Sequence, residues 1–117
     1  METAKIIKKS LEYSCTEKGD ILIVSFTGPI IRETIESMTR CELEILGKPL
    51  KRVVLHFQDV PDVDKVAIPT IARLQKAIRN KQWGLSMSFT DPKTRDFFKQ
   101  EGILRTEELL GRQDTSK

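Results

Sequence analysis

Three carboxylates lie close together near the middle of the chain, at Asp59, Asp62 and Asp64. Grouped carboxylates can bind a divalent cation or assist phosphate transfer, because their oxygens are hard ligands. The segment 59–65 supplies no glutamate, histidine or other further ligand. The pattern therefore favours a solvated loop in which aspartates cap turns and the helix that follows.

Two other side chains could carry chemistry, His56 as a catalytic residue and Thr70 as a phosphorylation site. His56 is the only histidine and lies between apolar neighbours, with no nucleophile close in sequence, so packing is the favoured role. Thr70 follows Pro69 and is expected on the surface of a helix, a backbone on which kinases rarely act. The sequence also has no glycine-rich phosphate loop. It predicts no catalytic residue, no metal site and no cofactor, and thus a binding module instead of an enzyme.

Length and composition are those of one water-soluble domain. The 117 residues include 38% hydrophobic and 32% charged residues, with a net charge of +3, a balance typical of a globular chain. The charge is spread along the sequence, so nucleic acid is not an expected partner. We expect a lead-in over residues 1–10, a single domain over 11–111 and a polar tail over 112–117.

The cysteines and the N-terminal residues bear on the compartment. Cys15 and Cys41 match no zinc or redox spacing and are expected as reduced thiols. The first ten residues lack the apolar core of a secretory signal. The longest apolar run, Ile21 to Val24, is too short to span a bilayer. These features predict a cytoplasmic protein without membrane insertion.

The elements around the aspartates can be read from periodicity and from turn residues. Alternation predicts strands over 11–15 and 21–27, joined by a turn at Gly19. Helical spacing and Gly47 predict a helix over 33–46. An apolar run predicts an interior strand over 53–57. The loop 59–65 comes next, and then a helix that begins near Val66, because Pro69 fits only the first turn.

The remaining elements complete an α/β fold. A strand is expected over 85–89, a helix from Asp91-Pro92 to Gly102, and a short helix over 107–110. The strand–helix–strand unit requires a parallel pair with a right-handed crossover. With the N-terminal hairpin, the result is a small mixed sheet covered by helices.

The helix after the loop has a basic side, formed by Arg73, Lys76 and Arg79, with Lys81 beside them. These cations could meet an acidic protein or membrane phosphates, which would make this side a second binding surface. A solvated face of an amphipathic helix is the more ordinary interpretation.

Two short segments resemble the signature of the STAS domain, the family of bacterial anti-sigma factor antagonists. Leu55–Asp59 is similar to the family's apolar strand and its first aspartate, and Val63–Ala67 lies where the family has Asp-Ser-Ser/Thr-Gly. Asp64 matches the signature aspartate. Lys65 takes the place of the first serine, Val66 that of the phosphoacceptor, and Ala67 that of the glycine.

The resemblance implies a function and a partner. In the family, the unmodified protein binds an anti-sigma factor kinase, and a phosphate at the helix mouth disrupts the interface by repulsion. Because Val66 has no hydroxyl, the binding is expected to persist without this switch. Asp62 and Asp64 could imitate the phosphorylated state, but Lys65 partly cancels their charge. The expected partner-binding residues are Asp59, Asp62, Asp64, Lys65, Val66 and Ala67.

Other roles known in the family do not need phosphorylation. The chain could be a structural subunit of a stress-signalling scaffold or of a lipid-transport ATPase complex. Its partner could then be another STAS protein, or a second copy of itself in a homodimer. The first expectation remains a cytoplasmic bacterial signalling protein that regulates transcription by binding a protein partner.

Overall fold

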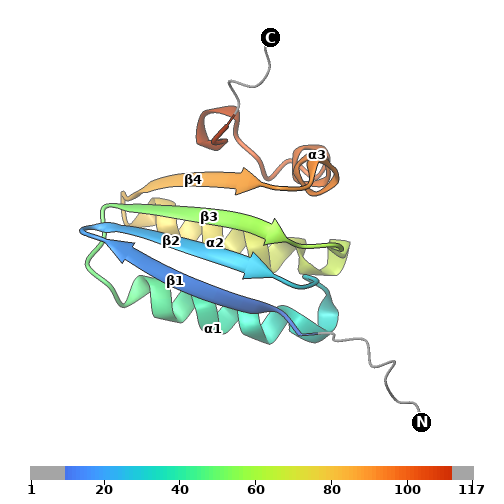
Figure 1. Cartoon of the computed structure of the whole chain (residues 1–117), viewed down its shortest axis with the longest axis horizontal. Coiled ribbons are helices and arrows are strands. Elements are labelled where there is room, and N and C mark those ends of the chain that lie inside the picture. The colour runs from blue at the N-terminus through green and yellow to red at the C-terminus, as the bar shows by residue number, and fades with distance from the viewer. Residues whose placement is uncertain (1–9, 112–117) are drawn as a thin grey trace.

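In the computed structural model, which describes residues 10–111, one mixed sheet has the strand order β1-β2-β3-β4. The strands are β1 (Glu12–Lys18), β2 (Ile21–Thr27), β3 (Arg52–Asp59) and β4 (Gly84–Phe89). β1 pairs with β2 in antiparallel fashion, and β2, β3 and β4 are parallel (Figure 1). The predicted fold class is confirmed. Most of the lead-in predicted over 1–10 and the whole tail over 112–117 lie outside the described residues.

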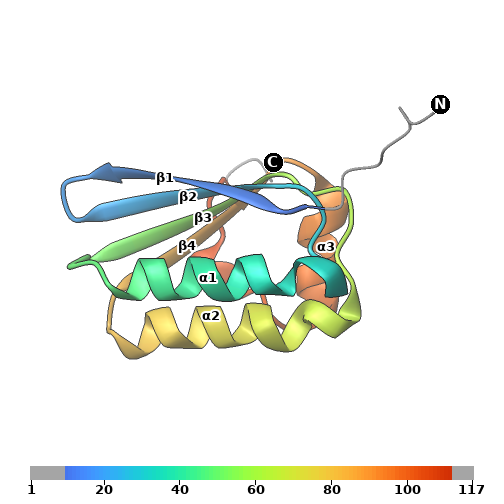
Figure 2. The same cartoon turned by 90° about the horizontal axis from the view of Figure 1, so that it is seen from below.

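Two helices cover one face of the sheet. α1 (Ile35–Leu46) and α2 (Ile68–Asn80) lie side by side beneath it, and α3 (Pro92–Gln100) stands at the end where the parallel strands finish (Figure 2). Short 3-10 turns precede α1 and α2, at Arg32–Thr34 and Lys65–Ala67. Pro69 lies in the first turn of α2, as predicted, because the missing N–H has no helical acceptor there.

The strands bury alternate residues against the helices. In β2 and β3, the period of two places Leu22, Val24, Val53 and Leu55 at 0% exposure, as expected for a half-covered sheet. Gly19 closes the first hairpin with φ +66°, the left-handed conformation that glycine adopts most easily. The hairpin therefore forms where the sequence predicts it.

An aromatic cluster fills the core at the carboxyl end of the parallel strands. Phe57 stacks on Phe26 and Phe89, with ring centroids 5.2 and 5.0 Å apart. Phe98 of α3 meets the Phe57 ring edge-on at 4.9 Å. Such ring pairs stabilise the fold beyond the effect of burial alone, because the quadrupoles of the rings attract one another. The cluster holds β3 and α3 together directly beneath the loop that follows β3.

The segment after α3 runs along the outer edge of β4. The N–H of Leu110 donates to the carbonyl of Met87 at 2.8 Å, and Leu109 forms a parallel bridge with Met87. In place of the short helix expected over 107–110, the structure has a 3-10 turn at Thr106–Glu108. This pairing with β4 favours an extended backbone at Leu109, which ends the turn early.

Tyr13 gives a test of the packing between β1 and α1. Its phenol donates to Glu44 Oε1 at 2.9 Å. Burial is the larger cause and the Glu44 carboxylate the smaller, and together they raise the Tyr13 pKa from 10.0 to about 12. The unfolded chain loses the proton at the lower pH, so the stabilising contribution of Tyr13 is complete below pH 10.0 and declines as pH rises toward about 12.

Tyr13 is the only tyrosine in the chain, so phenolate absorbance reports on it alone. We expect the folded protein to titrate near the raised value, and Glu44→Gln to lower the midpoint part of the way, because burial remains. A midpoint at the value of a free tyrosine in the folded wild-type protein would contradict the contact.

Candidate functional site

The loop after β3 lies at the edge of the sheet where the parallel strands end. It runs from Asp59, the last residue of β3, through the 3-10 turn Lys65–Ala67 into α2. We refer to residues 59–67 as the helix-mouth loop. Ligands and partners of parallel sheets commonly meet this edge, because the loops of neighbouring strands converge there.

Backbone hydrogen bonds tie the helix-mouth loop to the connection between β2 and α1. The N–H of Gly28 donates to the carbonyl of Asp59 at 2.8 Å, and that of Ile30 to Asp62 at 2.9 Å. The N–H of Asp64 returns to the carbonyl of Ile30 at 3.0 Å. Ile30 is fully buried, so it anchors the loop to the core. These tethers were not predicted, because bonds between backbone groups have no side-chain signal.

Val66 lies at the entrance of α2 and faces outward. Its exposed fraction is 44%, whereas the next residue, Ala67, is fully buried. The Lys65 side chain is 79% exposed, with Nζ 3.7 Å from Glu101 Oε2. An apolar side chain with this exposure at a helix entrance is available to a partner. Val66 therefore lies at the start of this helix, which is the position that the sequence predicts.

The capping of this helix differs from the expectation. Asp64 is the N-cap residue of the 3-10 turn, but its carboxylate makes no capping hydrogen bond. The N–H of Ala67 donates instead to the backbone carbonyl of Asp64, at 3.0 Å. A backbone carbonyl thus accepts this N–H in place of the Asp64 carboxylate. Asp64 itself is exposed.

The three aspartates are exposed and do not form a closed cluster. Asp59, Asp62 and Asp64 all have solvent-facing side chains. Over residues 10–111, no group of three or more histidine, cysteine, aspartate or glutamate side chains could hold a metal ion. Pro61 borders hollows of about 220, 270 and 370 Å³, of which Asp62 lines the first and Asp59 the other two. The helix-mouth loop therefore presents a negatively charged surface with shallow hollows.

α3 supports the helix-mouth loop from the other side. The hydroxyl of Thr94 donates to the carbonyl of Val60 at 3.1 Å, and both residues are buried. Asp91 caps α3, as predicted, by accepting from the N–H of Lys93 at 2.9 Å. The loop is therefore held by the β2–α1 connection on one side and by α3 on the other. The hydrogen bonds that hold it do not involve its outward side chains.

His56 lies within β3, and Thr70 lies within α2. His56 Nδ1 is 2.6 Å from the Ser88 hydroxyl oxygen, across the β3–β4 pair. The sequence could not reveal this pair, because the two residues are 32 positions apart. No third group within residues 10–111 is seen to orient the ring, so the pair is a cross-strand contact. Thr70 is half-buried within the first turn of α2.

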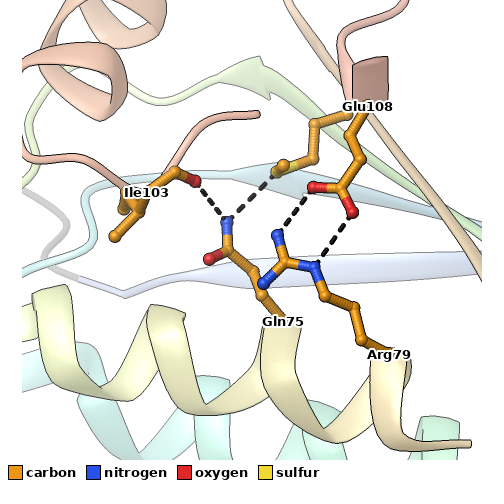
Figure 3. Close-up of polar contacts among 5 residues, drawn as sticks. Gln75, Arg79, Ile103 and Glu108 are labelled. Carbon is orange, nitrogen blue, oxygen red and sulfur yellow. Dashed lines mark hydrogen bonds and ion pairs between the residues drawn. The ribbon is translucent and has the colours of Figure 1, made fainter. Parts of the chain in front are cut away.

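The basic side of α2 is largely paired within the protein. Arg73 Nε donates to Glu42 Oε1 of α1 at 3.1 Å. Arg79 makes a two-bond pair with Glu108, with donor–acceptor distances of 2.9 and 2.6 Å (Figure 3). Lys76 is exposed and has no ion pair within the described residues 10–111. The second surface therefore has less available positive charge than the sequence suggests.

Comparison with known proteins relates this arrangement to a family. The profile of the STAS domain matches residues 12–112. An anti-sigma factor antagonist from Mycobacterium paratuberculosis is similar in structure, with a TM-score of 0.78 and 18% identity over 92% of each chain. No curated protein sequence matches the chain. Within residues 10–111, no helix is long and apolar enough to cross a membrane.

Two further solved structures share the fold. The Bacillus cell fate determinant SpoIIAA in its phosphorylated form has a TM-score of 0.64 and 9% identity, over 85% of this chain and 89% of its own. A Shewanella loihica protein of the DUF3478 family, with a SpoIIAA-like fold, has a TM-score of 0.58 and 12% identity, over 93% and 88%. These likenesses establish the fold.

Proposed function

Because the chain belongs to the STAS domain family, we propose that it is a non-catalytic adaptor that binds another protein through the helix-mouth loop. The observation that carries this proposal is Val66, an apolar side chain 44% exposed at the entrance of α2. Val66 follows the exposed residues Asp64 and Lys65 in the chain, and an apolar centre within a polar rim is typical of protein interfaces. The buried Ala67 beside Val66 and the backbone hydrogen bonds of the helix-mouth loop hold this valine in place.

The same residue bears on regulation. SpoIIAA has been solved in phosphorylated and unphosphorylated forms. A phosphate adds nearly two negative charges and three acceptor oxygens, and burying these against an apolar patch of a partner is costly. Val66 has no oxygen to modify, so binding at the helix-mouth loop is independent of phosphorylation at that position. The adaptor therefore lacks a phosphorylation switch at this residue.

The charges of the loop indicate the chemistry of the partner. Asp59, Asp62 and Asp64 give three carboxylates, and Lys65 gives a single ammonium group. A complementary partner surface is basic, with an apolar patch that receives Val66. An anti-sigma factor or a related kinase in bacterial signalling and transcription regulation is the partner we propose, in the cytoplasm.

A charge at Val66 tests this proposal. We expect Val66→Asp to reduce recovery of the partner from extract of the source cells by at least about tenfold, because a buried unpaired carboxylate is costly at an interface. Leu43→Asp is the matched control, since Leu43 is 69% exposed on α1. Equal recovery with wild type, Val66→Asp and Leu43→Asp would show that the helix mouth is not the interface.

A structural role in a larger complex is the second candidate. The observation in its favour is the same exposed valine, because permanent interfaces are more apolar than transient ones and a structural contact does not need a phosphoacceptor. Light scattering on the purified protein separates the two roles. A single-chain mass favours the antagonist-like adaptor, and a larger closed assembly favours a scaffold subunit or a homodimer.

A further inference from the structure

A hollow separate from the helix-mouth loop lies between the second half of α2 and the segment after α3. Its volume is about 540 Å³, within the usual range for small-molecule sites. The hollow exceeds each of the three beside Pro61. It is lined by Ala72, Gln75, Lys76, Arg79, Asn80, Gly102, Ile103 and Arg105.

The lining is cationic. Lys76 and Arg105 contribute positive charge, Arg79 contributes a guanidinium whose charge Glu108 balances, and no acidic residue is among the lining residues. Within residues 10–111, neither Lys76 nor Arg105 makes an ion pair. Both side chains are exposed. Two unpaired cations at one concave surface raise the local potential, because nearby low-dielectric walls focus the field.

The third cation is held rigidly. Arg79 is paired with Glu108, and the two side chains are 24% and 11% exposed. Figure 3 shows that this pair engages one side of the guanidinium, so the remaining nitrogen is directed away from Glu108. A fixed, planar guanidinium is well suited to phosphate oxygens, since little side-chain entropy remains to be lost.

The wall of the hollow is also fixed. Gln75 is only 2% exposed, and its amide nitrogen donates to the Ile103 carbonyl at 2.9 Å, with Met87 Sδ 3.3 Å away (Figure 3). These contacts join α2, β4 and the segment after α3. A hollow with such walls keeps its shape before a ligand arrives, which lowers the entropic cost of binding.

Stabilisation of the helix end explains only part of this charge. Cations in the last turn of a helix interact favourably with the helix dipole, which accounts for Arg79 near the end of α2. Arg105 comes from a different segment and faces the same hollow. The convergence of cations from two segments indicates an anionic occupant.

We propose that this basic hollow binds a small molecule that carries phosphate groups. A phosphate places two negative charges and several acceptor oxygens in a small volume, which matches cations that converge from two sides. Arg79 supplies the fixed donor, and Lys76 and Arg105 close on the ligand from the rim. Ala72 and Gly102 leave room for the body of the molecule.

Inorganic pyrophosphate is the probe for the test. Amide resonances in a two-dimensional NMR titration at constant ionic strength are expected to shift in a saturable way at Gly102 and Ile103. We expect Lys76→Glu and Arg105→Glu each to weaken binding at least about tenfold, as loss of a charge-assisted contact does. Both side chains are exposed and unpaired within the described residues, so the fold is expected to survive, which circular dichroism checks.

Lys99→Glu is the matched control, because it makes the same charge change at an exposed position of α3 outside the hollow. Its effect is expected to stay within about twofold under salt screening. The absence of saturable shifts at millimolar pyrophosphate would overturn the proposal. So would equal weakening by Lys99→Glu, which would indicate general attraction of anions.

Discussion

Phe57→Ala is expected to lower the free energy of unfolding by about 3–5 kcal/mol, the usual cost of truncating a core phenylalanine. Phe57 is 1% exposed and contacts the rings of Phe26, Phe89 and Phe98. Its loss removes the shared partner of three aromatic groups and leaves a cavity beneath the helix-mouth loop. Because most domains are stable by only about 5–15 kcal/mol, a large part of the stability is at risk.

Urea unfolding monitored by circular dichroism measures this effect. Leu43→Ala is a suitable control, since Leu43 is 69% exposed and surface changes usually stay within about 0.5 kcal/mol. The cluster also supports β3 and α3, so partner binding by Phe57→Ala should fall even where the protein remains folded. A loss of stability no greater than that of Leu43→Ala would contradict the role of the cluster.

Gly28→Ala is expected to cost at least about 2 kcal/mol, because backbone strain and a steric clash act together. Gly28 has φ +116°, and a Cβ there would collide with the carbonyl oxygen of Ser10 and lie 3.2 Å from Leu11 Cα. The groups in the way are backbone atoms, which cannot rotate aside. The N–H of Gly28 also holds Asp59, so the helix-mouth loop should shift and lose partner affinity.

Gly19→Ala separates strain from clash. Gly19 also has a positive φ, +66°, but a Cβ there meets nothing within 4 Å. This variant should cost about 1–2 kcal/mol from the left-handed backbone alone, and it should leave partner binding intact. Equal losses of stability in the two variants would argue against the close approach of Gly28 to Ser10.

Much of the fold could be predicted from local patterns. The hairpin turn has a glycine at the position that needs positive φ, and Pro69 marks the first turn of α2. Asp91 before Pro92 marks the start of α3, and its carboxylate does cap that helix. These signals are short-range, since each depends on a residue whose backbone preference acts within a few positions.

The parts that were not predicted depend on contacts between distant segments. Ile30 pairs with Val63 through backbone groups, and any residue other than proline could supply them. Arg79 was expected on an open basic face, but Glu108, 29 residues away, pairs with it. Charge patterns on one helix cannot show which carboxylates another segment will bring.

The position of Val66 was predicted more fully than the contacts that support the loop around it. Val66 was expected at a helix entrance because Pro69 restricts where the helix can start. Its exposure beside a buried Ala67 follows from helical geometry, in which adjacent residues point in different directions. The hollow at the other end of α2 was missed, because Arg105 reaches it from a segment whose path depends on pairing with β4.

The tethers of the helix-mouth loop have a consequence for how this protein can change over time. The bonds from Gly28, Ile30 and Asp64 use only main-chain atoms, so the loop's path does not depend on which side chains it displays. Substitutions at its outward positions can therefore alter affinity at little cost to folding. Such a surface is free to drift from one partner to another, and an engineer could rewrite it by randomising a few codons.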